Sequence, residues 1–268
     1  MTEAKLADKV PLFGIGINPT SYDEATAAVI EAAGARRSFA VSALATHGLM
    51  YGVLHSEFAE VLDRIDLVTP DGQPVRWAMN ILLETRLQDR VYGPQLTEHV
   101  CAAAEREQLS VYLFGSTEET CRQLVEALGR RFPKLSVAGI QPDRFREASP
   151  EEDGGDVERI IRSGAHIVLV GRGCPRQERW VAAHRGVIPA AMLAVGAAFD
   201  YLAGTLRPPP VWMQRAGLEW LYRLCQEPRR LWRRYLVTNI YFTVHFLRAW
   251  GRKGWQELRA RLERRRAD

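Results

Sequence analysis

The chain lacks the cysteine patterns and long apolar runs that mark several protein classes. Its four cysteines are widely spaced, with no Cys-x-x-Cys pair and no nearby histidine spacing, which excludes the common zinc-finger and dithiol redox patterns. No run approaches the roughly 20 apolar residues that span a bilayer, and residues 1–9 carry no apolar core of signal-peptide length. We therefore expect reduced thiols, a cytoplasmic location and only peripheral contact with any membrane.

Several nucleotide-binding and catalytic motifs are also missing. No Gly-x-Gly-x-x-Gly lies between a predicted strand and helix, since Gly14-Ile15-Gly16 lacks the third glycine, and this excludes a dinucleotide fingerprint. There is no Gly-Lys-Ser/Thr of a P-loop and no Gly-x-Ser-x-Gly of an α/β-hydrolase. With 268 residues, of which 47% are hydrophobic, the chain can still bury one large core, or one domain with an appendage.

Positive charge and tryptophan are concentrated towards the C-terminus. Residues 205–268 contain 15 Lys/Arg and 5 Asp/Glu, a net charge of +10, and since the whole chain carries +4, residues 1–204 carry −6. Five of the seven tryptophans lie in the same stretch: Trp212, Trp220, Trp232, Trp250 and Trp255. Amphipathic rings beside arginines suit an anionic membrane surface, where each basic residue contributes roughly 1 kcal/mol.

Three other interpretations of this stretch stay open. Basic residues with interleaved aromatics also suit phosphate tracking and base stacking in a nucleic-acid-binding protein, although the acidic residues 1–204 would then be unexplained. The apolar residues between Leu236 and Trp250 could instead pack on a neighbouring subunit of a homo-oligomer. A solvated helical face with a few core aromatics is the simplest interpretation, and we expect it for residues 257–268.

Apolar strand-like runs alternate with helix-period segments from about residue 39 onward. This alternation predicts an α/β fold in which a Rossmann-like, mostly parallel sheet is flanked by helices. The predicted strands cover residues 39–44, 66–69, 110–115, 135–139, 166–171 and 191–196, and one helix is predicted over residues 48–62. After Gly204 a stiff proline-rich segment is followed by helix alone. We therefore expect an α/β domain at 1–204 and a helical, membrane-associating appendage at 205–268.

Residues that directly follow the strands are the first candidates for a site, because ligands of a doubly wound sheet bind beyond the carboxyl ends of its strands. They are Thr46 and His47, Asp71 and Gly72, Gly115 and Ser116, residues 171–178, and residues 196–200. Helix N-termini after Gly115 and Gly173 offer free backbone N–H groups, and Arg172 and Arg176 add positive charge. A phosphate or diphosphate would be stabilised there.

Asp71 is the best candidate for a general base, because it lies at a strand end, with Arg76, Arg90 and His47 expected at the same mouth. The alternative is an ordinary turn aspartate that caps the next helix. His47 could carry a proton or donate to a phosphate oxygen, or could simply be a satisfied polar residue at a helix start.

Two other polar groups also have a functional and a structural interpretation. Gln177 and Glu178 could hold a nucleotide or sugar, although a glutamate in the first turn also stabilises a helix. Arg223, Arg230 and Arg233 would nearly share one face of a continuous helix, which Pro228 interrupts. A surface arginine stripe is the alternative interpretation.

Together these motifs resemble the WecG/TagA/CpsF glycosyltransferases, glycosyltransferase family 26. The resemblance rests on Asp71-Gly72, on Arg-Val-Tyr-Gly-Pro at 90–94 and on Gly-Arg-Gly-Cys-Pro-Arg-Gln-Glu at 171–178. It continues through residues 195–200, 203–204, 207–209, 217–223 and 227–230, so that it covers roughly residues 13–235 in order.

The resemblance implies an inverting enzyme that moves a sugar from a UDP-sugar to a polyprenyl-diphosphate-linked saccharide at the inner face of the bacterial plasma membrane. It places the catalytic aspartate on Asp71 and lipid-diphosphate contacts on Arg223, Arg230 and Arg233 of an appendage that covers the active site. From its position after the first predicted strand, we expect His47 to be a second catalytic residue. With the strand-end candidates, the expected donor-binding set is Ser42, Thr46, Arg90, Gly115, Gly171, Gly173, Arg176, Gln177, Glu178 and Asp200.

Two positions depart from the pattern of many members. Ser42-Ala43-Leu44, followed by Thr46, stands where they carry Thr-x-Asn, and Gln95 stands where an acidic residue often follows Tyr-Gly-Pro. Both departures favour a subgroup with another donor sugar. Because no Asp-x-Asp motif is present, we predict a metal-independent reaction without cofactor. A non-catalytic nucleotide-sugar-binding protein stays open if Asp71 is only a turn residue.

Overall fold

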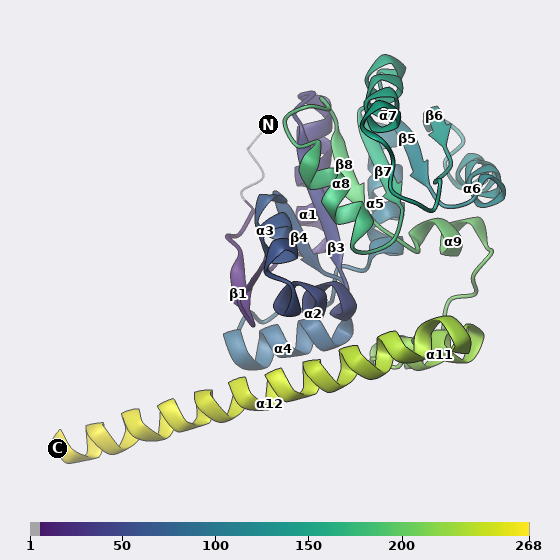
Figure 1. Cartoon of the computed structure of the whole chain (residues 1–268). Coiled ribbons are helices and arrows are strands. Elements are labelled where there is room, and N and C mark those ends of the chain that lie inside the picture. Colours follow the sequence, from purple (N-terminus) through teal and green to yellow (C-terminus); the bar gives the residue numbers. More distant parts are fainter. Residues whose placement is uncertain (1–5, 268) are drawn as a thin grey trace.

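A six-stranded sheet with parallel pairing throughout forms the centre of the computed structural model, which describes the backbone of residues 6–267 and the side chains of residues 6–256 (Figure 1). In spatial order its strands are β4 (Leu67–Pro70), β3 (Phe39–Leu44), β8 (Ala191–Ala194), β7 (Ile167–Gly171), β5 (Ser110–Gly115) and β6 (Ser136–Gln141). The predicted α/β class and Rossmann-like parallel sheet are confirmed. The side chains of residues 257–268, for which we expected a solvated face, lie outside the described part.

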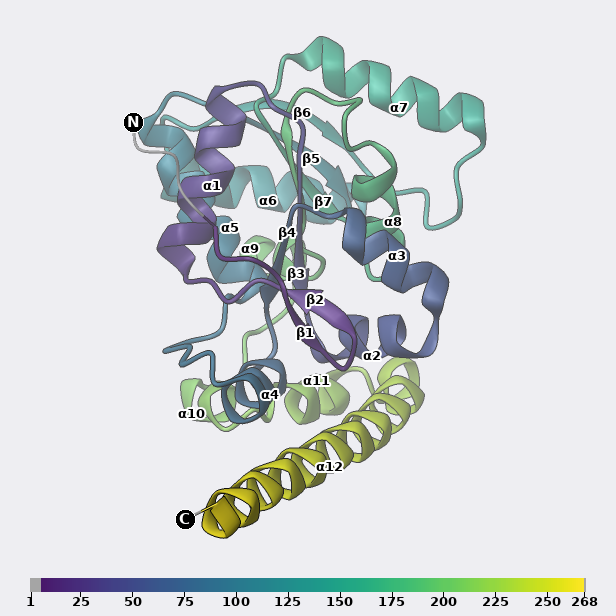
Figure 2. The same cartoon turned by 90° about the vertical axis from the view of Figure 1, so that its left-hand side faces the viewer.

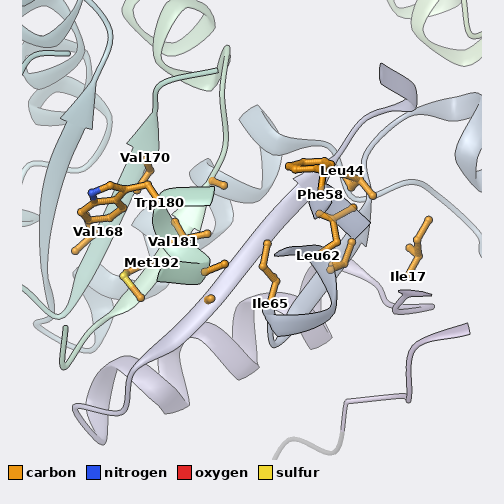
Figure 3. Packing of buried hydrophobic residues seen from close by; sticks show 14 of the residues in the cluster. Ile17, Leu44, Phe58, Leu62, Ile65, Val168, Val170, Trp180, Val181 and Met192 are labelled. Atoms are coloured by element: carbon orange, nitrogen blue, oxygen red, sulfur yellow. The ribbon is translucent and has the colours of Figure 1, made fainter. Parts of the chain in front are cut away.

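Helices bury both faces of the sheet, because successive strand residues point to opposite sides. One face carries Val168, Val170 and Met192, which pack with Phe58, Trp180 and their neighbours in a single apolar cluster (Figure 3). Its helices are α2 (Thr46–Leu54), α3 (Ser56–Arg64), α4 (Gln73–Leu83), α7 (Pro150–Ser163) and α8 (Arg176–Ala183). The other face is covered by α1 (Tyr22–Gly34), α5 (Gly93–Arg106), α6 (Glu118–Arg131) and α9 (Ala198–Ala203).

Two features near the N-terminus were not predicted. A short antiparallel hairpin, β1 (Val10–Leu12) and β2 (Ile15–Ile17), precedes α1, and its strands of three residues are too short to give a periodic signal. The single helix predicted over 48–62 is wrong, because the chain adopts an extended conformation at His55 (φ −132°, ψ 101°) between α2 and α3. This break turns α3 onto the sheet, where Phe58 and Leu62 are buried.

The C-terminal segment, residues 211–267, consists of helices joined by short turns and lies along one end of the α/β part (Figures 1 and 2). It consists of α10 (Val211–Arg215), α11 (Glu219–Gln226) and α12 (Pro228–Ala267), so Pro228, which we expected to interrupt a continuous helix, is the first residue of α12. The 40 residues of α12 span about 60 Å at 1.5 Å per residue. Phe242 and Phe246 pack against the core below α2 and α4, and Lys253 Nζ lies 2.6 Å from Glu84 Oε1. Within residues 6–267, no helix is long and apolar enough to cross a membrane.

Candidate active site

The carboxyl ends of the parallel strands gather most of the predicted site residues at one edge of the sheet. Ser42 is paired in register with Val68 of β4 and Ala194 of β8, and Gly115 of β5 faces Gly171 of β7. Asp71 follows β4 directly, at the same edge. The strand-end reasoning therefore identified an edge at which side chains from five strands and the following loops meet.

Asp71 is held at this edge by a backbone N–H group. Its Oδ2 accepts a hydrogen bond of 2.9 Å from the N–H of Gly93, at the start of α5. A Cβ on residue 93 would lie 3.2 Å from Asp71 Oδ2 and 3.1 Å from the Val195 carbonyl oxygen, so a larger residue would crowd this approach by a few tenths of an ångström. Burial raises the pKa of Asp71 to about 6, against the opposing effect of Arg90. A carboxyl group with this pKa can accept a proton at neutral pH.

Arg90 is fully engaged by the C-terminal segment. Its guanidinium forms a bidentate pair with Glu219 of α11, in which Nη2 lies 2.8 Å from Oε1 and Nη1 contacts Oε2. The same group stacks over the Tyr92 ring at 4.2 Å, and Arg90 is only 4% exposed. Sequence reasoning missed Glu219, although it lies inside the Gly-Leu-Glu-Trp motif at 217–220 that supports the family resemblance.

Thr46 lies beside the Asp71 turn, and His47 follows it in the first turn of α2, on the side of α12. His47 Nδ1 is 3.3 Å from Thr238 Oγ1 of α12, and burial together with Arg234 lowers the pKa of His47 to about 4. The imidazole is therefore neutral at pH 7 and can offer a hydrogen bond but no charge. Thr46 lies against the turn, since a Cβ on Gly72 would fall 2.8 Å from Thr46 Oγ1.

Ser42, Gln177 and Glu178 form a buried network under the loop that follows β7. Gln177 Oε1 accepts a bond of 3.1 Å from the Gly173 N–H, and its Nε2 donates to Glu178 Oε1 at 2.9 Å. Ser42 Oγ lies 3.5 Å from the same Glu178 oxygen. Burial raises the pKa of Glu178. The three side chains are 3% exposed or less, so they support the Gly173 loop from inside.

Gly115 and Gly171 allow two strands to approach closely at this edge. A Cβ on Gly115, whose φ is +133°, would lie 2.5 Å from the Gly171 carbonyl carbon. The Ser116 N–H donates to the Gly171 oxygen at 2.9 Å, and Ser116 Oγ lies 3.4 Å from Asp200 Oδ1. The predicted residues Gly115, Gly171 and Asp200 are thus brought together.

The arginines of the β7–α8 loop are paired with an aspartate that sequence reasoning missed. Asp143, in the loop after β6, accepts from Arg172 Nε at 3.1 Å and contacts Arg176 Nη2. The Asp143 side chain is only 1% exposed. Its sequence context, Gln-Pro-Asp-Arg, gives no signal of this role. Because Arg172 and Arg176 share one carboxylate, this group still brings a net positive charge to the edge.

The C-terminal arginines do not all converge. The Arg223 guanidinium of α11 lies 6.0 Å from the centre of the Tyr201 ring. Its positive charge opposes the rise in the pKa of Asp71 and of Asp200. Arg230 pairs with Glu227 at 2.5 Å, and its charge also opposes the rise in the pKa of Asp200. Arg233 lies instead over the exposed ring of Trp232.

Arg234, one residue further along α12, is the arginine whose positive charge lowers the pKa of His47. The helix begins at Pro228, and residues four apart, such as 230 and 234, lie on the same side of a helix. Among the side chains of residues 6–256, no group of three or more His, Cys, Asp or Glu is arranged to hold a metal ion.

The raised pKa of Asp71 predicts how Asp71→Asn changes stability with pH. The pKa of Asp71 is near 3.8 in the unfolded chain and about 6 in the folded chain, so the folded chain binds the Asp71 proton more tightly. The contribution of protonated Asp71 to stability is therefore complete below pH 3.8 and is lost as pH rises through about 6. We expect Asp71→Asn to melt at a higher temperature than the parent at pH 8 and at a similar temperature at pH 4. Thermal unfolding across this range, with exposed Asp63→Asn as control, measures it. A lower melting temperature at pH 8 would contradict the burial argument.

Comparison with known proteins identifies the family of this chain. The model of the Glycosyl transferase WecG/TagA/CpsF family matches residues 10–256. A protein of Bacillus subtilis (strain 168), named N-acetylglucosaminyldiphosphoundecaprenol N-acetyl-beta-D-mannosaminyltransferase, is 27% identical over 186 residues, 69% of this chain and 70% of that protein. A protein of the same name from Bacillus spizizenii (strain ATCC 23059 / NRRL B-14472 / W23) is 29% identical over 188 residues, 70% of each chain. Because the family model covers most of the chain, the protein belongs to the WecG/TagA/CpsF family of glycosyltransferases.

Proposed function

We propose that this protein transfers a sugar, with inversion, from a UDP-sugar to a polyprenyl-diphosphate-linked saccharide in the synthesis of a bacterial surface or secreted polysaccharide. The observation that carries the proposal is the partly buried Asp71 carboxylate, fixed by the Gly93 N–H at the carboxyl edge of the sheet with a pKa raised to about 6. The two Bacillus relatives support it, since their names describe the transfer of N-acetylmannosamine to a lipid-linked N-acetylglucosamine. This pair of sugars is the first to test.

Asp71 would act as the general base. Its Oδ2 is held by Gly93, which leaves Oδ1 to take the proton of the acceptor hydroxyl while the hydroxyl oxygen attacks C1 of the donor sugar. The bond between C1 and the UDP oxygen breaks on the opposite face, and its electron pair leaves with UDP. Backbone N–H groups in the first turns of α6 and α8, together with Arg176 and Arg223, would stabilise the charge of the departing diphosphate. His47, neutral at pH 7, would offer a hydrogen bond to the acceptor or donor.

Loss of the base should lower the turnover rate strongly. We expect Asp71→Asn to reduce kcat by roughly 100-fold to 10,000-fold, the usual range for general-base catalysis, with the affinity for UDP retained. The parent should lose activity as pH falls below about 6, because Asp71 becomes protonated. UDP release in the presence of lipid-linked acceptor measures both effects, and Asp63→Asn is the matched control. Near-normal turnover of Asp71→Asn would remove Asp71 from this role.

The arginines and helix N-termini of the edge would take the electrostatic part that a divalent metal has in many other transferases. We therefore propose a metal-independent reaction. Turnover should be the same in EDTA and in added magnesium or manganese, measured as UDP release. Loss of activity in EDTA, followed by recovery with manganese, would overturn the proposal.

One face of α12 supports peripheral binding to a membrane. Nine large apolar side chains of this helix are exposed: Trp232, Leu236, Val237, Ile240, Tyr241, Val244, Leu247, Trp250 and Trp255. Isolated exposed apolar residues are common, but a continuous row along one helix marks an interaction surface. Arg233, Arg248 and Arg252 are interspersed with it on α12. Apolar groups beside positive charge complement an anionic bilayer, which would bring the lipid-linked acceptor to the site.

Disruption of this face should abolish membrane binding. We expect Leu247→Glu/Trp250→Glu to lose flotation with liposomes that contain anionic phospholipid, because each glutamate opposes both burial and the surface potential. Ile161→Glu, a matched change at an exposed apolar residue of α7, should float like the parent. The two other occupants of the face give different results: binding to DNA or RNA in physiological salt, or a smaller particle by light scattering in the double variant.

A further inference from the structure

The pair between Arg90 and Glu219 is a sheltered ionic contact between the C-terminal segment and the strand edge. The side chains are 5% and 18% exposed, and the pair is bidentate. Gln214 of α10 adds a third contact, since its Oε1 lies 3.4 Å from Arg90 Nη2. The loss of one partner from such a pair leaves the other charge unpaired and poorly hydrated, which is strongly unfavourable. The contact is therefore a specific latch rather than a surface charge pair.

The backbone next to Arg90 leads directly to Asp71. The Val91 N–H donates to the Pro70 carbonyl at 3.0 Å, and two residues later the Gly93 N–H donates to Asp71 Oδ2. Tyr92, between them, lies under the Arg90 guanidinium and donates its N–H to the Tyr22 hydroxyl at 3.0 Å. Residues 90–93 are thus a short strap, with Glu219 bound at one end and the Asp71 carboxylate at the other.

We propose that Glu219 is a positioning residue of the transfer reaction: by holding Arg90, it fixes the strap whose Gly93 N–H orients Asp71, so that the base is correctly placed only when the C-terminal segment is seated. The inference rests on the function proposed above. It gives Arg90 a structural part in place of direct contact with the donor, because the guanidinium is already occupied on both sides. It also makes the seating of α11 a condition for catalysis.

Electrostatics link the same groups. The Glu219 carboxylate raises the pKa of Asp71, while Arg90 lowers it, and burial has the largest effect. Removal of the Glu219 charge takes away one cause of the high pKa, and it also leaves the positive charge of Arg90 unopposed beside Asp71. Both changes act in the same direction, towards a lower pKa of the base.

A second ionic contact of the same segment offers a matched control. Glu84, at the end of α4, pairs with Lys253 near the far end of the described side chains of α12. It joins the same two parts of the molecule, but its carboxylate is 73% exposed and it has no contact with residues 90–93. Glu84→Gln therefore removes a docking contact without touching the strap.

Hydrogen exchange on the full-length chain tests the latch without any assay of activity. We expect Glu219→Gln to speed exchange of the Gly93 amide and of residues 219–226 roughly tenfold, since the contact that keeps them closed is lost. Glu84→Gln should leave the Gly93 amide unchanged. Unchanged protection of Gly93 in Glu219→Gln would overturn the proposal, whether or not the proposed reaction is correct.

Kinetics test the consequence for the base. Glu219→Gln should lower kcat roughly 10-fold to 100-fold, as expected for a misplaced catalytic group, with the affinity for UDP unchanged. The acid limb of its rate profile should move to lower pH. Glu219→Asp, which keeps the charge, should keep the parent's acid limb and serves if the glutamine variant folds poorly. Tighter UDP binding with faster turnover in Glu219→Gln would mean that Glu219 competes with the donor for Arg90, and would overturn the proposal.

Discussion

The organisation of this protein depends on a carboxylate held in a partly buried position at the end of a strand. Ionised Asp71 is disfavoured by burial, and it is tolerated because a backbone N–H contacts it directly and Arg90 lies near. This requirement fits the small residue at position 93, and it fits the strap from Arg90 to Gly93, which is tied down on both sides. The fold supplies the rigid sheet edge on which so close an approach can be kept.

The second organising feature is the separation of charge along the chain. Residues 1–204 are acidic overall and residues 205–268 are strongly basic. The basic part is therefore attracted both to the acidic part and to any anionic surface. The contacts that matter at the site nevertheless reverse this pattern, since Glu219 is an acidic residue of the basic part and Arg90 a basic residue of the acidic part. The Arg90–Glu219 pair is thus a sheltered contact of α11, whereas Arg229, Arg230, Arg233 and Arg234 of α12 are exposed.

Much of the fold could be predicted from local pattern. Residues 39–44 and 110–115 were predicted as strands end to end, because continuous apolar runs bounded by polar turns are typical of strands buried on both faces. The hairpin β1–β2 and the break at His55 were missed, since strands of three residues and a single extended residue leave no period to detect. The candidate site was predicted as a set of strand ends, but Glu219, Asp143 and Arg234 were not, because their partners lie far away in sequence.

The sequence by itself determined the order of strands and helices, the charge asymmetry, the residues at the carboxyl edge and the family. These depend on short-range periodicity and on which residue types follow each strand. Tertiary structure decided which charges meet: that Arg90 binds Glu219, that Arg172 and Arg176 share Asp143, and that Gln177 and Glu178 face inward. The physical reason is that pairing and desolvation depend on distances between different elements, 29 residues apart for Asp143 and Arg172 and 129 for Arg90 and Glu219, which no local pattern encodes.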